Sequence, residues 1–226
     1  MPDRYAKNHA LMTECEQLLL REKTAAVVGL GGLGGHIAEQ LARLGFGGLI
    51  LVDGDRIEAS NLNRQLFATE KTLGMPKTEA AAMRLREVNS SLVYTLYDTK
   101  LTSENGRTIL SGADVVFDAV DTIETRLLLQ KICDDLLIVL IHGSIGGWWG
   151  QVSVIYPGDN TLSSLYSEER AAGAEREYGN PAFIPALVAS IQVAEALKYC
   201  LKRPGGLRNK LLRIDLLEQT YFSVEV

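Results

Sequence analysis

The sequence predicts an α/β fold, Rossmann-like, with a mostly parallel sheet that carries helices on both faces. Three observations lead to this fold class. Apolar runs typical of buried strands alternate with helical patterns over residues 24–142. A glycine-rich turn, VVGLGGLGG, joins the first apolar run to the first helical pattern. The chain has 226 residues, of which 46% are hydrophobic, and this is enough for one full core.

The first three elements follow from hydrophobic spacing. The apolar run from Ala25 to Leu30 is expected to be a buried strand. Ile37, Leu41 and Leu44 then recur at helical spacing, and a second strand is expected from Leu49 to Val52.

The next elements continue the alternation of helix and strand. Pro76 marks the start of a helix rich in good helix formers, PKTEAAAMRLREV, and residues 92–97 predict a strand. Ser103 is expected to cap a short helix before the strand DVVFDAV. A helix over residues 122–133 and a buried strand over residues 137–142 complete the parallel part.

The C-terminal part predicts an antiparallel extension of the sheet. After residue 142 a glycine-rich bend leads into an alternating strand that ends at Pro157, and residues 158–180 read as a long polar loop. A helix follows, and residues 205–226 suggest a closing hairpin. The apolar stripe of that helix is expected to comprise Phe183, Leu187, Ile191, Ala194 and Leu197.

Composition excludes several function classes. The net charge of −5 and the lack of a basic block argue against nucleic acid as a partner. The polar N-terminus is unlike a secretory signal, and the apolar run from Leu136 to Ile141 is too short to span a bilayer, so we expect a cytoplasmic protein without a membrane partner. Cys15, Cys133 and Cys200 form no C-x-x-C pair, so no zinc site is expected, and each is interpreted as a small buried hydrophobe.

The glycine turn points to a nucleotide. Gly29, Gly31 and Gly34 fit G-x-G-x-x-G, which lets backbone amides and a helix N-terminus face a phosphate. Asp53 ends the next strand, where a carboxylate accepts hydrogen bonds from ribose hydroxyls. The alternative is a turn that only packs a helix tightly on a strand.

Charged residues farther along favour ATP over a dinucleotide. Lys77 falls in the first turn of a helix, where a cation opposes the helix dipole unless an anion lies there. Arg64 and Lys77 together are suited to the β- and γ-phosphates, although both also fit ordinary surface cations. Asp118 and Asp121 end a parallel strand, where oxygen ligands suit Mg²⁺, and Asp121 alternatively fits a helix N-cap.

The motifs GLGGLG, VDGDRIEASNLNRQLF, LGMPKTEAA and DAVDT closely resemble the HesA/MoeB/ThiF family of ubiquitin-activating E1-like adenylyltransferases, in particular small zinc-less ThiF-like members. The resemblance runs in order from about Arg4 to the C-terminus. It implies one adenylation domain over residues 1–226: a helical arm at 1–23, a nucleotide-binding half at 24–142, and a carrier-binding half at 143–226 with a crossover loop at about 158–180.

The same resemblance implies the reaction. ATP and Mg²⁺ would be used to adenylate the C-terminal carboxylate of a small ubiquitin-like (β-grasp) sulfur-carrier protein, with release of pyrophosphate. A separate persulfide donor would then supply sulfur for thiamin or molybdopterin biosynthesis.

Family motifs also assign residues. The catalytic residues implied are Arg64, Lys77 and Asp121, with Arg4 or Lys7 contributed by the neighbouring subunit of a homodimer. Asp121 is the implied metal ligand. The implied nucleotide-binding residues are Gly29, Gly31, Gly32, Gly34, Asp53, Asp55, Ser60, Asn61, Asn63, Arg64, Gln65, Lys77, Asp121 and Thr122.

Several positions depart from the family pattern. Lys7 stands where arginine is usual, and Thr122 where asparagine is usual. No cysteine falls between Tyr156 and Tyr199, which implies a chemistry that stops at the acyl-adenylate. Lys7 and Thr122 leave open a non-catalytic protein. Two further alternatives are a relative that activates a small molecule or RNA, and an NAD- or FAD-binding oxidoreductase. The adjacent Trp148 and Trp149 suit either a groove for the carrier tail or the core.

Overall fold

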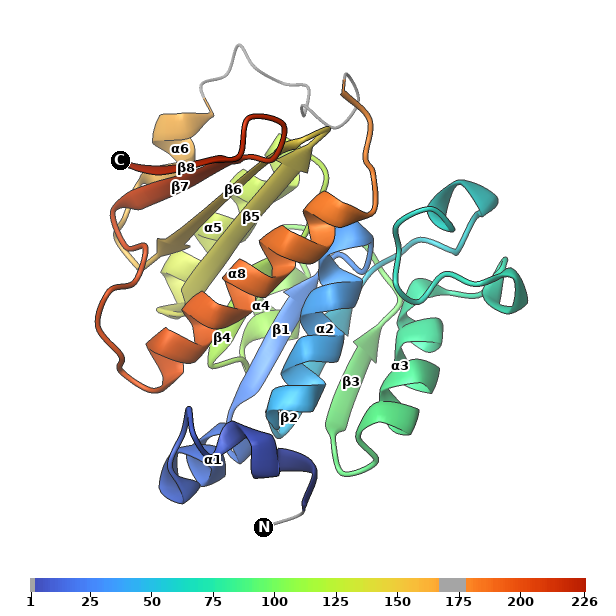
Figure 1. Ribbon diagram of the computed structural model, residues 1–226. Coiled ribbons are helices and arrows are strands. Elements are labelled where there is room, and N and C mark those ends of the chain that lie inside the picture. The colour runs from blue at the N-terminus through green and yellow to red at the C-terminus, as the bar shows by residue number, and fades with distance from the viewer. Residues whose placement is uncertain (1–2, 167–177) are drawn as a thin grey trace.

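A computed structural model describes residues 3–166 and 178–226, and within them one mixed sheet forms the centre of the molecule (Figure 1). Its eight described strands are ordered β3-β2-β1-β4-β5-β6-β7-β8. The strands are β1 (Thr24–Val28), β2 (Gly48–Val52), β3 (Val93–Tyr97), β4 (Val115–Asp118), β5 (Val139–Gly146), β6 (Trp149–Ile155), β7 (Lys210–Asp215) and β8 (Thr220–Glu225).

The first five strands are parallel, and β6, β7 and β8 extend the sheet antiparallel. The predicted Rossmann-like fold class and its antiparallel C-terminal extension are therefore confirmed. The helices are α1 (Glu14–Arg21), α2 (Gly32–Leu44), α3 (Lys77–Val88), α4 (Gly106–Leu110), α5 (Ile123–Leu136), α6 (Thr161–Leu165) and α8 (Phe183–Cys200). Short 3-10 helices cover η1 (Asp3–Asn8), η2 (Ala59–Asn61) and η3 (Glu70–Thr72).

Helices cover both faces of the sheet because β1, β2, β4 and β5 are buried on both sides. In β1, Ala25 and Val27 pack in the core under α2, α3 and α8, whereas Ala26 and Val28 pack in the core under α4, α5 and α6. Figure 1 shows α2 and α8 side by side on the near face.

The buried face of α8 differs from the predicted stripe by about one position. Ile184 and Val188 are fully buried, whereas Phe183 is exposed and Leu187 and Ile191 are half-buried. Apolar residues surround α8, so the sequence alone does not mark one face, and packing on α2, β5 and β6 selects it. In the described part of the chain, α8 alone is long and apolar enough to cross a membrane, and half of it is buried inside the domain.

The short α4 helix begins later than predicted. Ser103 does not cap it and donates instead to Glu104 Oε1 at 2.8 Å. Thr102 Oγ1 accepts hydrogen bonds from the backbone N–H groups of Glu104 and Asn105 at 3.3 and 3.4 Å, so this turn precedes the helix, which starts at Gly106.

The segment expected to be a loop at 158–180 contains α6 in its described part. Gln130 on α5 holds this helix, because its Nε2 donates to Asp159 O at 3.3 Å and its Oε1 accepts from Leu162 N at 2.8 Å. Most of the predicted crossover loop, residues 167–177, lies outside the described residues. The expectation of a structureless segment is wrong at α6, which is too short to show a helical period.

Candidate functional site

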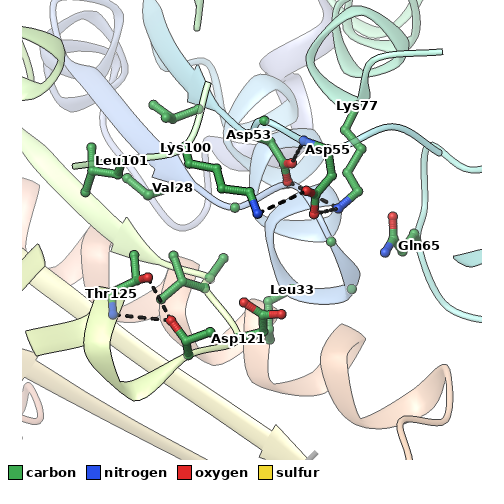
Figure 2. A pocket seen from close by; sticks show the side chains of 18 of the residues that line it. Val28, Leu33, Asp53, Asp55, Gln65, Lys77, Lys100, Leu101, Asp121 and Thr125 are labelled. Atoms are coloured by element: carbon green, nitrogen blue, oxygen red, sulfur yellow. Dashed lines mark hydrogen bonds and ion pairs between the residues drawn. The ribbon is translucent and has the colours of Figure 1, made fainter. Parts of the chain in front are cut away.

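A pocket of about 510 Å³ opens at the carboxyl ends of β1, β2 and β4. The glycine turn after β1 forms its floor, and loops after β2, β3 and β4 form its sides (Figure 2). Open parallel sheets bind ligands at this edge, where neighbouring strands send their connections to opposite faces.

Two glycines of the turn are required by close packing. Gly29 has a φ of +89°, and a Cβ there would lie 2.5 Å from the Ala119 carbonyl oxygen. A Cβ on Gly34 would lie 1.8 Å from the Gly29 carbonyl oxygen. Gly34 therefore packs α2 against the turn and does not line the pocket, whereas Gly31 and Gly32 do. Close packing therefore accounts for Gly34, whereas Gly31 and Gly32 are open to a ligand in the pocket.

Asp53 organises the turn from the end of β2. Its Oδ2 accepts from Leu30 N at 2.7 Å, and its Oδ1 accepts from Asp55 N at 2.8 Å. The carboxylate therefore ties the turn after β1 to the turn after β2. It remains on the pocket wall, where its oxygens have further acceptor capacity for a hydroxyl group.

Lys77 has carboxylate partners at the start of α3. Its Nζ lies 3.1 Å from Asp55 Oδ2 and 3.5 Å from Asp53 Oδ2 (Figure 2). The anion that offsets the dipole of α3 is thus supplied by the protein itself. Lys77 is 9% exposed and lines the pocket, so it is no ordinary surface cation.

Arg64 reaches the pocket from the loop after η2. Its Nη1 donates to Ser60 O at 3.0 Å and to Asn63 Oδ1 at 2.9 Å. Its Nε is buried without a hydrogen-bond partner among the described residues, which leaves a donor suited to an anion. Ser60 and Asn63 thus orient Arg64 and do not line the pocket, whereas Asn61 and Gln65 do.

Asp121 lies across the pocket from Lys77 in Figure 2. Asp121 is exposed. The N-cap of α5 is Thr122 and not Asp121, because Thr122 Oγ1 accepts a hydrogen bond from Thr125 N at 3.3 Å. The Thr122 hydroxyl also lies 2.7 Å from Thr125 Oγ1. Thr122 and Thr125 both line the pocket, but this contact engages the Thr122 hydroxyl.

Asp118 is not beside Asp121, contrary to the sequence expectation. It is fully buried on the α5 side of β4, because successive residues of a strand face opposite sides. Asp118 Oδ2 lies 2.7 Å from His142 Nδ1. Burial lowers the pKa of His142, against the opposing effect of Asp118, so the neutral ring donates from Nδ1. Asp118 is therefore no candidate metal ligand.

The N-terminal arm lies far from the pocket of its own chain. Arg4 donates to Asn89 Oδ1, and the buried Tyr5 hydroxyl accepts from Asn89 Nδ2 at 3.0 Å. Asn89 follows the last residue of α3, whereas Lys77 is the first, and the 12 residues of α3 span about 17 Å. Figure 1 shows the arm below the sheet, opposite the carboxyl ends of the parallel strands. One protomer therefore does not bring Arg4 and Lys7 to the other site residues.

A family model described as the ThiF family matches residues 5–226. The chain belongs to the ThiF family. The SAMP-activating enzyme E1 of Haloferax volcanii is 33% identical over 98% of this chain and 84% of its own length. The molybdopterin-synthase adenylyltransferase of Haemophilus influenzae is 35% identical over 87% of this chain and 82% of its own. The chain spans about half the length of some other curated relatives.

The fold is also that of solved structures. MccB of E. coli, crystallised with MccA, superposes with a TM-score of 0.83 at 22% identity, over 100% of this chain and 72% of that one. This likeness concerns the fold, including the antiparallel strands after β5.

Sequence reasoning missed the pocket residues after β3. Thr99, Lys100 and Leu101 line the wall beside Asp55, and Lys100 Nζ lies 3.9 Å from Asp55 Oδ1. The sequence does contain a signal for these residues. Neighbouring parallel strands end at the same edge of the sheet, so the residues after β3 must lie near those after β2. Asn180 also lines the pocket, and only the fold brings it there from the segment before α8.

The thiols of this ThiF-family chain lie outside the pocket. Cys15 is exposed on α1, which corrects the expectation that all three are buried. Burial raises the pKa of Cys200 to about 12 and that of Cys133 further still. Across the part of the chain that the structure describes, no three His, Cys, Asp or Glu side chains form a metal-binding group.

Trp148 and Trp149 are half-exposed at the bend between β5 and β6, so the core interpretation is wrong. Trp148 packs on Phe183 with ring centroids 4.7 Å apart. Gly147 at this bend has a φ of +57°. The bend thus presents aromatic surface at the start of α8.

Proposed function

We propose that this ThiF-family protein is an ATP-dependent adenylyltransferase that activates the C-terminal carboxylate of a small ubiquitin-like sulfur-carrier protein. The product is an acyl-adenylate and pyrophosphate. The names of its relatives, an adenylyltransferase and an E1-type activating enzyme, support this reaction. The name of a third relative, the sulfur carrier protein adenylyltransferase of Thermus thermophilus, supports the substrate class.

The observation that carries the proposal is the combination of charges in one pocket. Arg64 and Lys77 provide two cations within the same wall as the glycine turn, and Asp121 provides a carboxylate opposite them. A dinucleotide dehydrogenase has no use for a second cation and a metal ligand at this place. ATP with Mg²⁺ uses all three.

The residues fit Mg²⁺. Asp121 offers a hard oxygen ligand in an open pocket, and Mg²⁺ is typically held by one or two carboxylates together with substrate phosphates and water. A set of three protein ligands is therefore not needed. When bound there, the ion would offset charge on the phosphates.

We assign the other roles by position. Gly31 and Gly32 approach the phosphates, Asp53 holds the ribose, and Arg64 and Lys77 hold the terminal phosphates. Asn61 and Gln65 line the same wall. Asp55 is displaced from Lys77 as phosphate arrives.

The chemistry requires little proton transfer. The carrier carboxylate attacks the α-phosphorus, the bond from that phosphorus to the bridging oxygen breaks, and pyrophosphate leaves with the electron pair. Arg64 and Lys77 stabilise the charge that develops on the leaving group. Catalysis then rests on alignment of the carboxylate and on preorganised cations. Trp148 and Trp149 are suited to the approach of the carrier tail.

The site is completed by a second copy of the chain. Arg4 and Lys7 lie at the opposite end of the protomer from Lys77, so they contribute only if the arm of a partner reaches the pocket. We therefore propose a homodimer. We also propose a cytoplasmic enzyme that receives sulfur for its carrier from a separate persulfide donor, since its own thiols lie outside the pocket.

Exchange of labelled pyrophosphate into ATP tests the proposal. Purified protein, Mg²⁺ and candidate sulfur carriers should support exchange that requires the intact carrier C-terminus. A carrier lacking its last residue is the matched control. Exchange without any carrier but with a small carboxylic acid would favour a small-molecule substrate. Failure with every carrier and acid, despite tight ATP binding, would favour a non-catalytic protein.

A further inference from the structure

The loop that carries Asp121 is held at the residue before it. Val120 N donates to Asp118 Oδ1 at 3.2 Å, and Val120 O accepts from Arg126 Nη2 at 2.6 Å. Both backbone polar groups of Val120 are therefore bonded to side chains beneath the pocket. Asp118 is 0% and Arg126 is 3% exposed, so these side chains belong to the core and not to the pocket surface.

The Arg126 guanidinium is itself held on other sides. Its Nε lies 3.9 Å from Asp118 Oδ2, and its Nη1 donates to the Tyr166 hydroxyl at 3.3 Å. Tyr166 directly follows α6, which ends at Leu165. Arg126 thus connects the loop after β4 to the end of α6.

Hydrogen bonds close this connection into a ring. Tyr166 OH accepts from Gln151 Nε2 at 2.8 Å, and Gln151 Nε2 also lies 3.1 Å from His142 Nε2. Since His142 donates from Nδ1 to Asp118, its Nε2 is the acceptor for Gln151. The ring runs from Asp118 through His142, Gln151 and Tyr166 to Arg126.

A buried ring of this kind costs desolvation energy, and apolar residues of similar volume often stabilise a fold as well or better. Its geometry points to another role. A carboxylate ligand of Mg²⁺ must be aimed accurately, because this ion demands nearly octahedral coordination. Residues that do not touch the metal but hold its protein ligands in place commonly control metal affinity.

We propose that Arg126 is a positioning residue, which fixes the Val120 carbonyl and thereby directs Asp121 toward the metal, and that Tyr166 holds Arg126 for this task. The inference rests on the proposed role of Asp121 in Mg²⁺ binding. It predicts that Arg126 controls the contribution of Mg²⁺ to nucleotide binding and leaves the metal-free binding of the nucleotide nearly unchanged.

Calorimetry with α,β-methylene-ATP tests this without turnover. The affinity of the full chain is measured with Mg²⁺ and with a chelator, and the ratio of the two gives the Mg²⁺ enhancement. Arg126→Lys keeps the buried charge but is too short to reach both Val120 O and Tyr166. It should lower the enhancement about tenfold and change metal-free affinity less than about twofold. Arg107→Lys, at an exposed pair with Asp135 on α5, is the matched control and should change neither.

Tyr166→Phe keeps the aromatic side chain and removes only the hydroxyl. It therefore tests the contact between Tyr166 and Arg126 if Arg126→Lys fails to fold. It should lower the enhancement about threefold. Equal losses with and without Mg²⁺, or an unchanged enhancement in a folded Arg126→Lys protein, would overturn the inference. A parent protein that binds the nucleotide equally well with and without Mg²⁺ would also overturn the inference on Arg126, but it would leave the nucleotide site itself supported. A parent that binds no nucleotide would contradict the proposed function and the inference together.

Discussion

The ammonium group of Lys77 lies 3.1 Å from Asp55 Oδ2 and 3.5 Å from Asp53 Oδ2, so a cation at the start of α3 is held between two carboxylates at the pocket wall. Asp55 is half-exposed, whereas Asp53 is fixed by two backbone N–H groups. A phosphate that enters the pocket can therefore replace Asp55 as the partner of Lys77, while Asp53 stays in place.

Removal of either pocket cation should abolish most adenylation. Lys77→Ala and Arg64→Ala each take away charge stabilisation worth about 2–4 kcal/mol, or about two to three decades in the rate of pyrophosphate exchange. Lys71→Ala, at an exposed lysine of η3, is the matched control. Asp53 keeps its backbone donors, so Lys77→Ala should still unfold cooperatively. If either folded variant exchanges pyrophosphate at a rate within about threefold of the parent, that residue does not stabilise the transition state.

The arm should act on the partner subunit. A double variant, Arg4→Ala with Lys7→Ala, and the site variant Lys77→Ala should each be nearly inactive alone. After they are mixed and allowed to exchange subunits, half of the dimers are mixed, and each has one complete site, so about a quarter of parent activity should return. Light scattering should show a dimer. Full activity in a stable monomer, or no recovery in demonstrably mixed dimers, would argue against the shared site.

Stability should fall in mild acid because of His142. Burial holds its pKa below the ordinary value of 6.5, so the unfolded state binds the proton more tightly than the folded state. The free energy of unfolding should be at its full value above about pH 6.5 and should fall as the pH is lowered toward the folded pKa. Urea unfolding of the parent and of His142→Gln over this range measures the effect. The variant should lose part of the pH dependence, and the rest includes His36, whose pKa burial also lowers.

The thiols should be dispensable for exchange. Cys15 is exposed and should react with a maleimide in the native protein, whereas Cys133 and Cys200 should react only on unfolding, because burial raises their pKa. A variant with all three cysteines replaced by alanine or serine should keep pyrophosphate exchange, apart from lost core stability. A carrier–enzyme thioester sensitive to thiols would contradict this.

The sequence predicted the parallel strands well, because continuous apolar runs and a glycine turn are local signals. Gly29 and Gly34 were found for the same reason, since their spacing reflects close packing. The buried face of α8 was missed because apolar residues surround that helix. Asp118 was misplaced because the side to which a strand residue points depends on register, and the partner His142 lies 24 positions away.

Within the pocket, motifs identified residues of the loops after β1, β2 and β4 and Lys77 of α3, and they left out the residues after β3 and the residue before α8. Lys100 and Asn180 follow no motif, and their positions depend on strand order and on the path into α8. The partners of Lys77 were likewise unexpected. The sequence predicted an anion beside Lys77 at the start of α3 but did not identify it. In the structure Asp55 is that anion, and the pocket beside it is open to a phosphate.

Direct detection of the acyl-adenylate tests whether this protein adenylates a sulfur carrier. The protein, ATP, Mg²⁺ and a candidate sulfur carrier are mixed with pyrophosphatase, quenched in acid, and examined by mass spectrometry of the intact carrier. We expect a carrier whose mass increases by one adenylyl group, attached at the C-terminal carboxylate, and almost no such product with Lys77→Ala. A carrier of unchanged mass, in a mixture where ATP binds and the carrier C-terminus is intact, would contradict the proposed adenylation.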